Sequence, residues 1–520
     1  MLTPNGQSAS KIEKVMLLSL WANSLNDELN LRKESEKRII FAGIGKPTYP
    51  INSNTIKSYL NYWKNLDQMS QKWYENPEGS EEAAAVDYGD PRGDIEPREI
   101  MAKVMSSWYE SEITPDNILF TVGGIGALRV IFETFNTHYD DIPGYRIITP
   151  FPHYSAYSNN PRHRLHPVDV MSVPGYKLKG YALEKSIREA YEQAENDHGL
   201  PKAVLLCNPS NPIGTIIDEE DLLQIADVLR RYPDLYIILD EAYAEMAYKP
   251  LPSFLKLAPD LKLRTIILRS ATKALSAAGE RMAVLMVFEQ ALMNEMLNKN
   301  ISYFIHAPRS AQVAYAQTME KFNVVEQKNL SRFYRKKIDY VIMRLHAMGA
   351  AMPDPMYDVD ATFYVLADFS DLFGLDLPTE IQRVMQKSDK ISTGEELAYY
   401  LLFNDRVMVS PLSYFGLPTD CGFIRITCSG NDAELRELMD RLEKRLFEAR
   451  MNKKLLMVEK INQKFPELKL LDGHMHEIMS KKIDAIIHGE NSCLILKGKN
   501  QVLEKLYTTI VSFLGFISAE

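Results

Sequence analysis

The sequence predicts an α/β protein in which short buried strands alternate with amphipathic helices. Three apolar runs, at residues 203–207, 236–239 and 265–268, each end abruptly in polar residues. Strands that are buried on both faces of a parallel sheet have such continuous apolar runs, and the amphipathic segments between them are typical of covering helices. Because ligands of open α/β sheets bind beyond the carboxyl ends of the strands, we expect functional residues directly after each run.

The composition is that of an ordinary globular protein and argues against nucleic-acid binding. Of 520 residues, 46% are apolar and 25% are charged, so a large core is expected. The 60 basic and 69 acidic side chains give a net charge of −9, and no segment is dominated by lysine and arginine. Proteins that bind nucleic acid usually carry a basic surface, so no nucleic-acid partner is expected.

Cysteine spacing and hydropathy indicate a chain of the reducing cytoplasm, without a metal site or a membrane span. The cysteines are Cys207, Cys421, Cys428 and Cys493. None forms the C-x-x-C pair that is typical of zinc or redox sites. The apolar run at 283–288 is far too short to cross a bilayer. Residues 15–22 resemble a signal peptide, but their apolar positions recur with helical spacing, which predicts an amphipathic arm helix.

The segment after the third run carries the strongest chemical signal. Ser270, Lys273 and Arg281 follow that run, with small residues between the lysine and the arginine. Desolvation at a buried strand end favours a neutral lysine amine, which can form a Schiff base with a carbonyl cofactor. A hydroxyl and a guanidinium nearby can bind a phosphate. A lone buried lysine is usually structural, but this combination seldom arises by chance.

The second run is followed by Asp240 and Tyr243. A carboxylate at this position can pair with a protonated ring nitrogen, which a pyridine cofactor needs in order to withdraw electrons, and a tyrosine can donate to a ring oxygen. The alternative interpretation is an aspartate that caps a helix.

Two loops complete the predicted site. The first run leads into residues 208–215, where prolines and a glycine fix a turn and leave Asn211 free to bond the same ring oxygen. Upstream, Gly123 and Gly124 begin a segment with helical spacing through Phe135, so backbone N–H groups and the helix dipole would face an anion. A glycine turn alone is a weak signal. Beside a serine and an arginine, it predicts a phosphate site.

Together these motifs resemble the class I/II aminotransferases of fold type I, the aspartate aminotransferase-like enzymes that use pyridoxal 5′-phosphate. The resemblance extends over residues 41–427, and the segment 270–283 agrees with the family pattern at every constrained position. It implies a large domain with a mostly parallel seven-stranded sheet between helices, and a smaller α+β domain. The implied division is 1–50 as an N-terminal arm, 51–310 as the large cofactor domain, 311–450 as the small domain, and 451–520 as an extension without an assigned role.

The resemblance also implies a role for each motif residue. Lys273 would hold the cofactor and carry the catalytic proton, Tyr154 would stack on the cofactor ring, and Tyr88 would reach the phosphate of a neighbouring subunit. A homodimer with shared active sites is therefore implied. The implied catalytic residues are Lys273, Asp240 and Tyr243. The implied cofactor-binding residues are Gly123, Gly124, Ile125, Tyr154, Asn211, Asp240, Tyr243, Ser270, Lys273, Arg281 and Tyr88. Gly45 and Arg425 would bind the substrate α-carboxylate.

The implied activity is transfer of an amino group from an L-amino acid to a 2-oxo acid by ping-pong Schiff-base chemistry. A decarboxylase or lyase on the same fold, such as an aspartate β-decarboxylase, is the alternative, because the same residues stabilise a carbanion without dictating its fate. A non-catalytic cofactor-binding regulator is less favoured. The residues before Phe41 are too few for the DNA-binding domain that such regulators carry.

Three positions depart from the family pattern. Ile125 stands where many members have a hydroxyl residue, so one side-chain phosphate donor is missing. Leu412 stands where a glycine is usual near the pocket. Ile301 stands where dicarboxylate-specific members have an arginine, although Arg309 is near enough in the sequence to substitute. Recognition of an acidic substrate side chain therefore lacks its usual partner.

Overall fold

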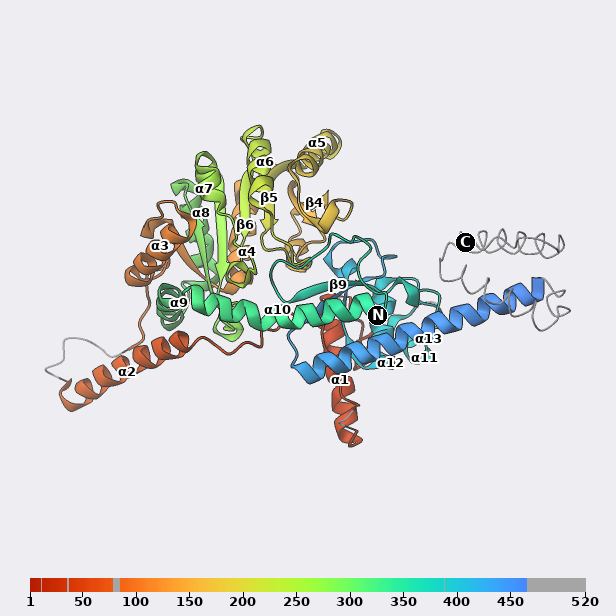
Figure 1. Ribbon diagram of the computed structural model, residues 1–520. Helices are drawn as coiled ribbons and strands as arrows, with labels where there is room; N and C mark the ends of the chain where they lie inside the picture. Colours follow the sequence, from red (N-terminus) through yellow and green to blue (C-terminus); the bar gives the residue numbers. More distant parts are fainter. Residues whose placement is uncertain (11, 35–36, 78–84, 388, 465–520) are drawn as a thin grey trace. The chain divides into compact units, whose positions relative to one another are not determined.

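The computed structural model describes residues 1–10, 12–34, 37–77, 85–387 and 389–464 (Figure 1). The chain divides into two units. Unit 1 is Met1–Leu442, and unit 2 is Glu443–Glu520, of which the described part is the end of one long helix. Residues 78–84 and most of the predicted extension from 451 lie outside the described residues. The predicted boundary between large and small domains within unit 1 stays a prediction.

The α-helices and strands have the following bounds. The helices are α1 (Lys14–Leu31), α2 (Ser53–Glu75), α3 (Ile95–Tyr109), α4 (Gly123–His138), α5 (Gly180–Asp197), α6 (Glu219–Arg230), α7 (Phe254–Leu257), α8 (Gln290–Phe304), α9 (Arg309–Lys321), α10 (Val324–Ala347), α11 (Thr379–Met385), α12 (Gly394–Asp405) and α13 (Asp432–Lys464). The strands are β1 (Ile40–Phe41), β2 (Ile118–Val122), β3 (Tyr145–Phe151), β4 (His163–Asp169), β5 (Leu200–Cys207), β6 (Tyr236–Asp240), β7 (Thr265–Ser270), β8 (Met282–Val287), β9 (Tyr364–Asp368), β10 (Val407–Met408), β11 (Ser410–Pro411) and β12 (Phe423–Thr427).

A seven-stranded sheet in the order β2-β8-β7-β6-β5-β3-β4 forms the centre of unit 1. Every strand of this sheet except β8 runs in the same direction. The three predicted apolar runs are the adjacent strands β5, β6 and β7, whose carboxyl ends therefore meet at one edge. The predicted α/β class and the mostly parallel seven-stranded sheet are confirmed.

Helices bury both faces of this sheet at its centre, which explains the continuous apolar runs of β5, β6 and β7. Leu205 and Ile238 belong to a core cluster that includes residues of α4 and α8, whereas their neighbours Val204 and Ile237 point to the opposite face and are equally buried. Successive strand residues alternate between the faces, so burial of both faces requires a run without polar residues.

A second, antiparallel sheet in the order β11-β12-β9 contributes two residues to the site. Its central strand β12 carries Arg425, which lies opposite Leu366, and β9 begins with Tyr364, which lies opposite Thr427. Strands β1 and β10 form a separate parallel pair, and β10 directly precedes β11 in the sequence.

The arm helix predicted at 15–22 is the first half of α1. Its buried residues Leu18, Ala22, Leu25 and Leu29 recur every three or four positions, which is the spacing of one helix face. Within the described ranges, no helix is long and apolar enough to cross a membrane.

A fully buried ion cluster fixes the ends of β6 and β7. The guanidinium of Arg269 on β7 lies 2.5 Å from Glu245, donates to the hydroxyl of Tyr109 at 2.9 Å, and lies over the ring of Trp108. Tyr109 in turn donates to Glu241, the residue after Asp240. Arg269 is 0% exposed, so its charge depends on these partners. The cluster joins the end of α3 to the two strand ends that carry Asp240 and Lys273.

We predict that Arg269→Met lowers the free energy of unfolding by about 3–5 kcal/mol, because it leaves two buried carboxylates without a cation. Urea denaturation measures the change. Arg230→Met is the matched control: Arg230 pairs with Asp227 and Asp260 on the exposed surface, so its loss costs less than about 1 kcal/mol. Equal losses in the two variants would contradict a special role for the buried cluster.

Candidate active site

A cavity of about 290 Å³ lies beyond the carboxyl ends of β5, β6 and β7. Most of the predicted site residues line it. These are Gly45, Gly124, Ile125, Tyr154, Asn211, Asp240, Tyr243, Ser270, Lys273, Arg281 and Arg425. Segments far apart in the sequence therefore converge where the sheet topology predicts a ligand.

The amine of Lys273 lies in this cavity directly after β7. Its Nζ donates a hydrogen bond to the backbone oxygen of Gly45 at 2.6 Å. Within the described residues it makes no ion pair with an aspartate or glutamate, so the amine remains available. A side chain at position 45 would collide with the hydroxyl of Tyr364 and would lie 3.2 Å from Nζ. Glycine is therefore required for this close approach.

Asp240, the last residue of β6, is buried and has one side-chain partner among the described residues. Tyr157 donates its hydroxyl proton to Oδ2 of Asp240 at 2.7 Å. Burial raises the pKa of the Asp240 carboxyl, and the hydrogen bond from Tyr157 partly offsets that rise. A cation beside this carboxyl would favour its ionised form, as the nitrogen of a protonated pyridine would.

Asn211 and Tyr243 meet on the other side of the cavity. The amide nitrogen of Asn211 donates to the hydroxyl of Tyr243 at 3.4 Å, and this hydroxyl lies 2.9 Å from that of Tyr364. Burial raises the pKa of the Tyr243 phenol well above its ordinary value, so the phenol keeps its proton and can donate it in a hydrogen bond. The two donors, predicted separately from two loops, thus converge on one position.

Arg425 on β12 is a buried cation without an acidic partner among the described residues. It donates from Nη1 to Asn211 at 2.8 Å and from Nη2 to the backbone oxygen of Gly43 at 2.7 Å. Its guanidinium lies over the rings of Tyr364 and Phe415, and its Nε has no hydrogen-bond partner. A buried arginine whose partners are all neutral is suited to bind a carboxylate.

The start of α4 and the loop after β7 bring together groups that could bind an anion. Gly123 has a φ of +71°, and a Cβ at this position would lie 2.5 Å from Nη2 of Arg281. The first N–H groups of an α-helix have no partner within the helix, and Gly124 in the first turn of α4 lines the cavity. The hydroxyl of Ser270 lies 2.7 Å from that of Thr272. Like Lys273, Arg281 has no acidic partner among the residues described.

Two predicted residues stand apart from the cavity lining. Gly123 lies behind its wall, where it permits the approach of Arg281. Tyr88 is 76% exposed and does not line the cavity, and its ring contacts that of His306 with 6.0 Å between centroids. Its predicted role at a neighbouring subunit stays a prediction. Arg309 donates to Asp94 at 2.7 Å and is not part of the lining either.

Sequence reasoning missed about half of the residues that line the cavity. Thr272 and Cys207 lie in segments that were recognised, but no motif gave them a role, and Tyr364 lies on β9, outside the predicted motifs. Tyr157 belongs to a short helical turn after β3, and only the fold brings it to Asp240. Its position three residues after Tyr154 is only a weak sequence signal for a place in the same site.

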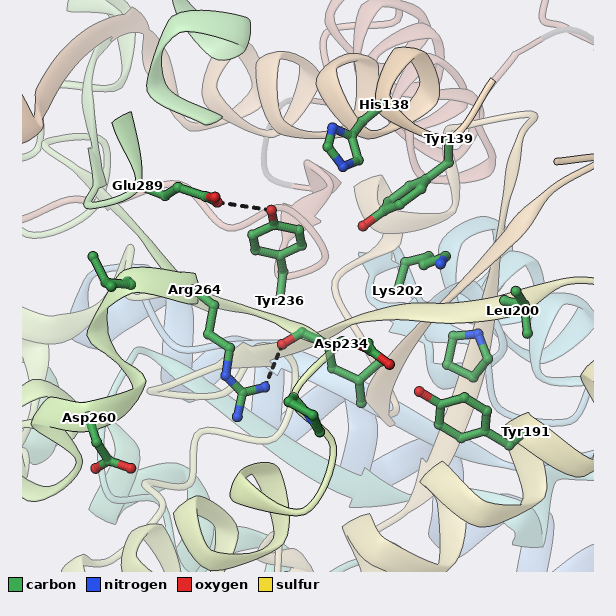
Figure 2. Close-up of a pocket in the computed structure, with 14 residues that line it drawn as sticks. His138, Tyr139, Tyr191, Leu200, Lys202, Asp234, Tyr236, Asp260, Arg264 and Glu289 are labelled. Carbon is green, nitrogen blue, oxygen red and sulfur yellow. Dashed lines mark hydrogen bonds between the residues drawn. The ribbon is translucent and has the colours of Figure 1, made fainter. Parts of the chain in front are cut away.

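A larger hollow lies at the opposite edge of the same sheet, where β5 and β6 begin (Figure 2). Its volume is about 630 Å³. Figure 2 shows the hydrogen bond that the Tyr236 hydroxyl donates to the Glu289 carboxylate, and the two oxygens lie 2.9 Å apart. Its lysine, Lys202, lies over the ring of Tyr139. None of the predicted site residues lines this hollow. Most of them line the smaller cavity at the carboxyl ends of β5, β6 and β7.

Known proteins resemble this chain in both sequence and fold. The aspartate aminotransferase of Pyrococcus horikoshii is 24% identical over 388 residues, which are 72% of this chain and 88% of that protein. A 1-aminocyclopropane-1-carboxylate synthase of Vigna radiata is 29% identical over 234 residues, 42% of this chain and 61% of that protein. The crystal structure of the aspartate aminotransferase from Rhizobium meliloti matches with a TM-score of 0.65 at 21% identity, over 85% of this chain and 98% of that one.

The model of the family "Aminotransferase class I and II" matches residues 60–442. This match covers most of the chain and includes the strand ends that carry Asp240, Ser270 and Lys273. It agrees with the fold and with the cavity built from these residues. The chain therefore belongs to the class I and II aminotransferases, a family of pyridoxal-phosphate-dependent enzymes of fold type I.

Proposed function

We propose that this chain binds pyridoxal 5′-phosphate and transfers an amino group from an L-amino acid to a 2-oxo acid. The observation that carries the proposal is the arrangement around Lys273. Its unpaired amine shares one cavity with a buried carboxylate, Asp240, and with a buried arginine, Arg425, that has no acidic partner among the described residues.

The residues of the cavity suit each part of this cofactor. Asp240 would hold the proton of the ring nitrogen, Asn211 and Tyr243 would bond the ring oxygen, and Tyr154 would cover one face of the ring. For the phosphate, Ser270 and Arg281 would supply side-chain donors, together with the first N–H groups of α4. Thr272, whose hydroxyl lies 2.7 Å from that of Ser270, can replace the donor missing at Ile125.

When bound, the cofactor would supply an electron sink for the negative charge that develops at the substrate Cα. Arg425 and the backbone at Gly45 would hold the α-carboxylate and so fix the direction of the Cα–H bond. Lys273 would then remove the proton from Cα and deliver it to the cofactor, because a flexible amine can reach both the substrate Cα and the cofactor. Burial of Asp240 and Tyr243 excludes water from the charged end of the site.

A homodimer with shared active sites is part of the proposal. Helix α2 has a buried side at Thr55 and Ser58, and it exposes Ile56, Leu60 and Trp63 on one face at helical spacing. Tyr88 follows this helix in the chain and is also exposed, which supports its predicted contact with the phosphate of a second subunit.

A lyase or decarboxylase remains the second candidate, because one relative is named a 1-aminocyclopropane-1-carboxylate synthase. Product analysis separates the two activities. If glutamate forms only when 2-oxoglutarate is supplied, the enzyme transfers amino groups. Release of carbon dioxide or ammonia without an acceptor would favour the alternative.

We expect Lys273→Ala to remove covalent cofactor binding and to lower amino transfer by at least about 10²-fold, since it deletes the proton carrier. Mass spectrometry after borohydride reduction measures attachment, and coupled assays measure activity. Lys202→Ala, at the opposite edge of the sheet, should change neither. Amino transfer by Lys273→Ala at a near-normal rate would contradict the assignment.

We expect Tyr157→Phe to raise the pKa of the bound cofactor's ring nitrogen by about one unit, a value of the size that a lost charge-assisted hydrogen bond gives. Without the hydrogen bond from Tyr157 the carboxylate of Asp240 is less stabilised and is therefore a stronger base, so the ring proton is held more firmly and leaves at higher pH. Nitrogen NMR of labelled cofactor measures the titration. Tyr145→Phe removes another buried hydroxyl, which bonds Asn136, and should cause no shift. The same shift in both variants would contradict a specific role of Tyr157.

We expect Trp63→Glu to shift the protein from dimer toward monomer, because it puts a charge into the exposed face of α2. Light scattering after size exclusion measures the mass. Leu263→Glu, which alters a comparably exposed apolar residue at the opposite edge of the sheet, should leave the dimer intact. A dimer that is unaffected by Trp63→Glu would place the interface elsewhere.

A further inference from the structure

The chain segment at the start of α1 forms one wall of the catalytic cavity. Glu13, Val15 and Met16 line it, opposite residues that belong to the sheet edge. The remaining wall near them is apolar and includes Ile44, Ile125, Leu128 and Phe415. This part of the cavity therefore combines apolar walls with one carboxylate, that of Glu13.

The carboxylate of Glu13 does not cap helix α1, which follows it in the chain. Glu13 is the residue before α1, but its side chain makes no capping hydrogen bond. Ser155 donates to its Oε1 at 3.3 Å, and the ion pairs of the described residues include none with Glu13. The adjacent Lys14 pairs instead with Glu395 at 3.3 Å. The negative charge of Glu13 thus remains available at the cavity.

Each cation that lines the cavity already has a role under the proposed function. Lys273 serves the cofactor aldehyde, Arg281 the phosphate and Arg425 the α-carboxylate. Arg309, the predicted substitute for the missing arginine at position 301, is bound to Asp94 outside the cavity lining. No further cation among the lining residues is available for a second substrate carboxylate.

We propose that the amino-acid substrate has a side chain with an apolar stem and a positively charged end, and that Glu13 binds this end. The inference rests on the proposed function and names the substrate class of that site. The apolar stem would lie along Val15 and Met16, as the methylene stems of lysine and arginine do on other apolar surfaces. A dicarboxylic amino acid would instead bring a second negative charge toward Glu13, which is unfavourable.

The pair L-arginine and L-citrulline tests this proposal, because the two side chains have nearly the same size and differ in charge. We expect the wild-type protein to react with arginine about tenfold faster than with citrulline in the amino-donor half-reaction, as measured by the change in cofactor absorbance; tenfold corresponds to about 1.4 kcal/mol. Glu13→Gln should reduce this ratio to about one, because it slows the reaction with arginine much more than the reaction with citrulline. A purely structural role of Glu13 would change both rates alike.

Glu28→Gln is the matched control, because Glu28 is an exposed glutamate on the same helix, outside the cavity lining, where it faces Arg32. It should keep the wild-type ratio. Dissociation constants from calorimetry, measured with cofactor-loaded Lys273→Ala, give a second measure that does not depend on turnover. The affinity for arginine should fall about tenfold with Glu13→Gln and also fall as salt is added.

The possible outcomes distinguish failure of the proposed substrate class from failure of the proposed function. If no amino acid changes the cofactor absorbance, the proposed function itself fails. If citrulline or leucine reacts but arginine has no advantage that Glu13→Gln removes, only the role of Glu13 is overturned. Preference of the wild-type protein for aspartate or glutamate would also overturn it.

Discussion

The parallel pairing of β5, β6 and β7 is the constraint on which the active site depends. In this register Cys207 lies opposite Asp240, and Asp240 lies opposite Leu268, so three strands end within two residues of one another. The loop with Asn211, the carboxylate of Asp240 and the loop with Lys273 begin at these ends. A shift of one residue in either pairing would turn Asp240 to the other face of the sheet.

A cluster of buried charges stabilises the ends of β6 and β7 on the side that faces away from the cavity. Arg269 and Glu241 are neighbours in the sequence of Ser270 and Asp240, and they point away from the cavity into an ion cluster with Glu245. Alternation along a strand explains the arrangement: one side chain faces the cavity and the next faces the protein interior. The same short segments therefore supply the reactive groups and their anchor.

The sequence was sufficient to predict the α/β class, the three central strands, the arm helix and about half of the cavity lining. These features depend on local patterns: apolar runs, helical spacing, and motifs such as S-x-x-K directly after a strand. Tyr157 and Tyr364 could not be predicted in this way, because they reach the site only through the packing of β3 and β9 against distant elements. The same holds for Glu13, which lies far from every motif. The contact made by Tyr88 depends on a second subunit and stays a prediction.

Under the proposed function, recognition of the amino acid and binding of the cofactor would be divided between different parts of the chain. Asp240 and Ser270 end strands of the central sheet and Lys273 follows one of them, whereas Glu13 precedes α1 and Arg425 belongs to the antiparallel sheet. Mutations in a few N-terminal positions would then alter which amino acid is accepted while the groups around Lys273 stay unchanged. Such a separation lets related enzymes diversify in substrate range without first losing their chemistry.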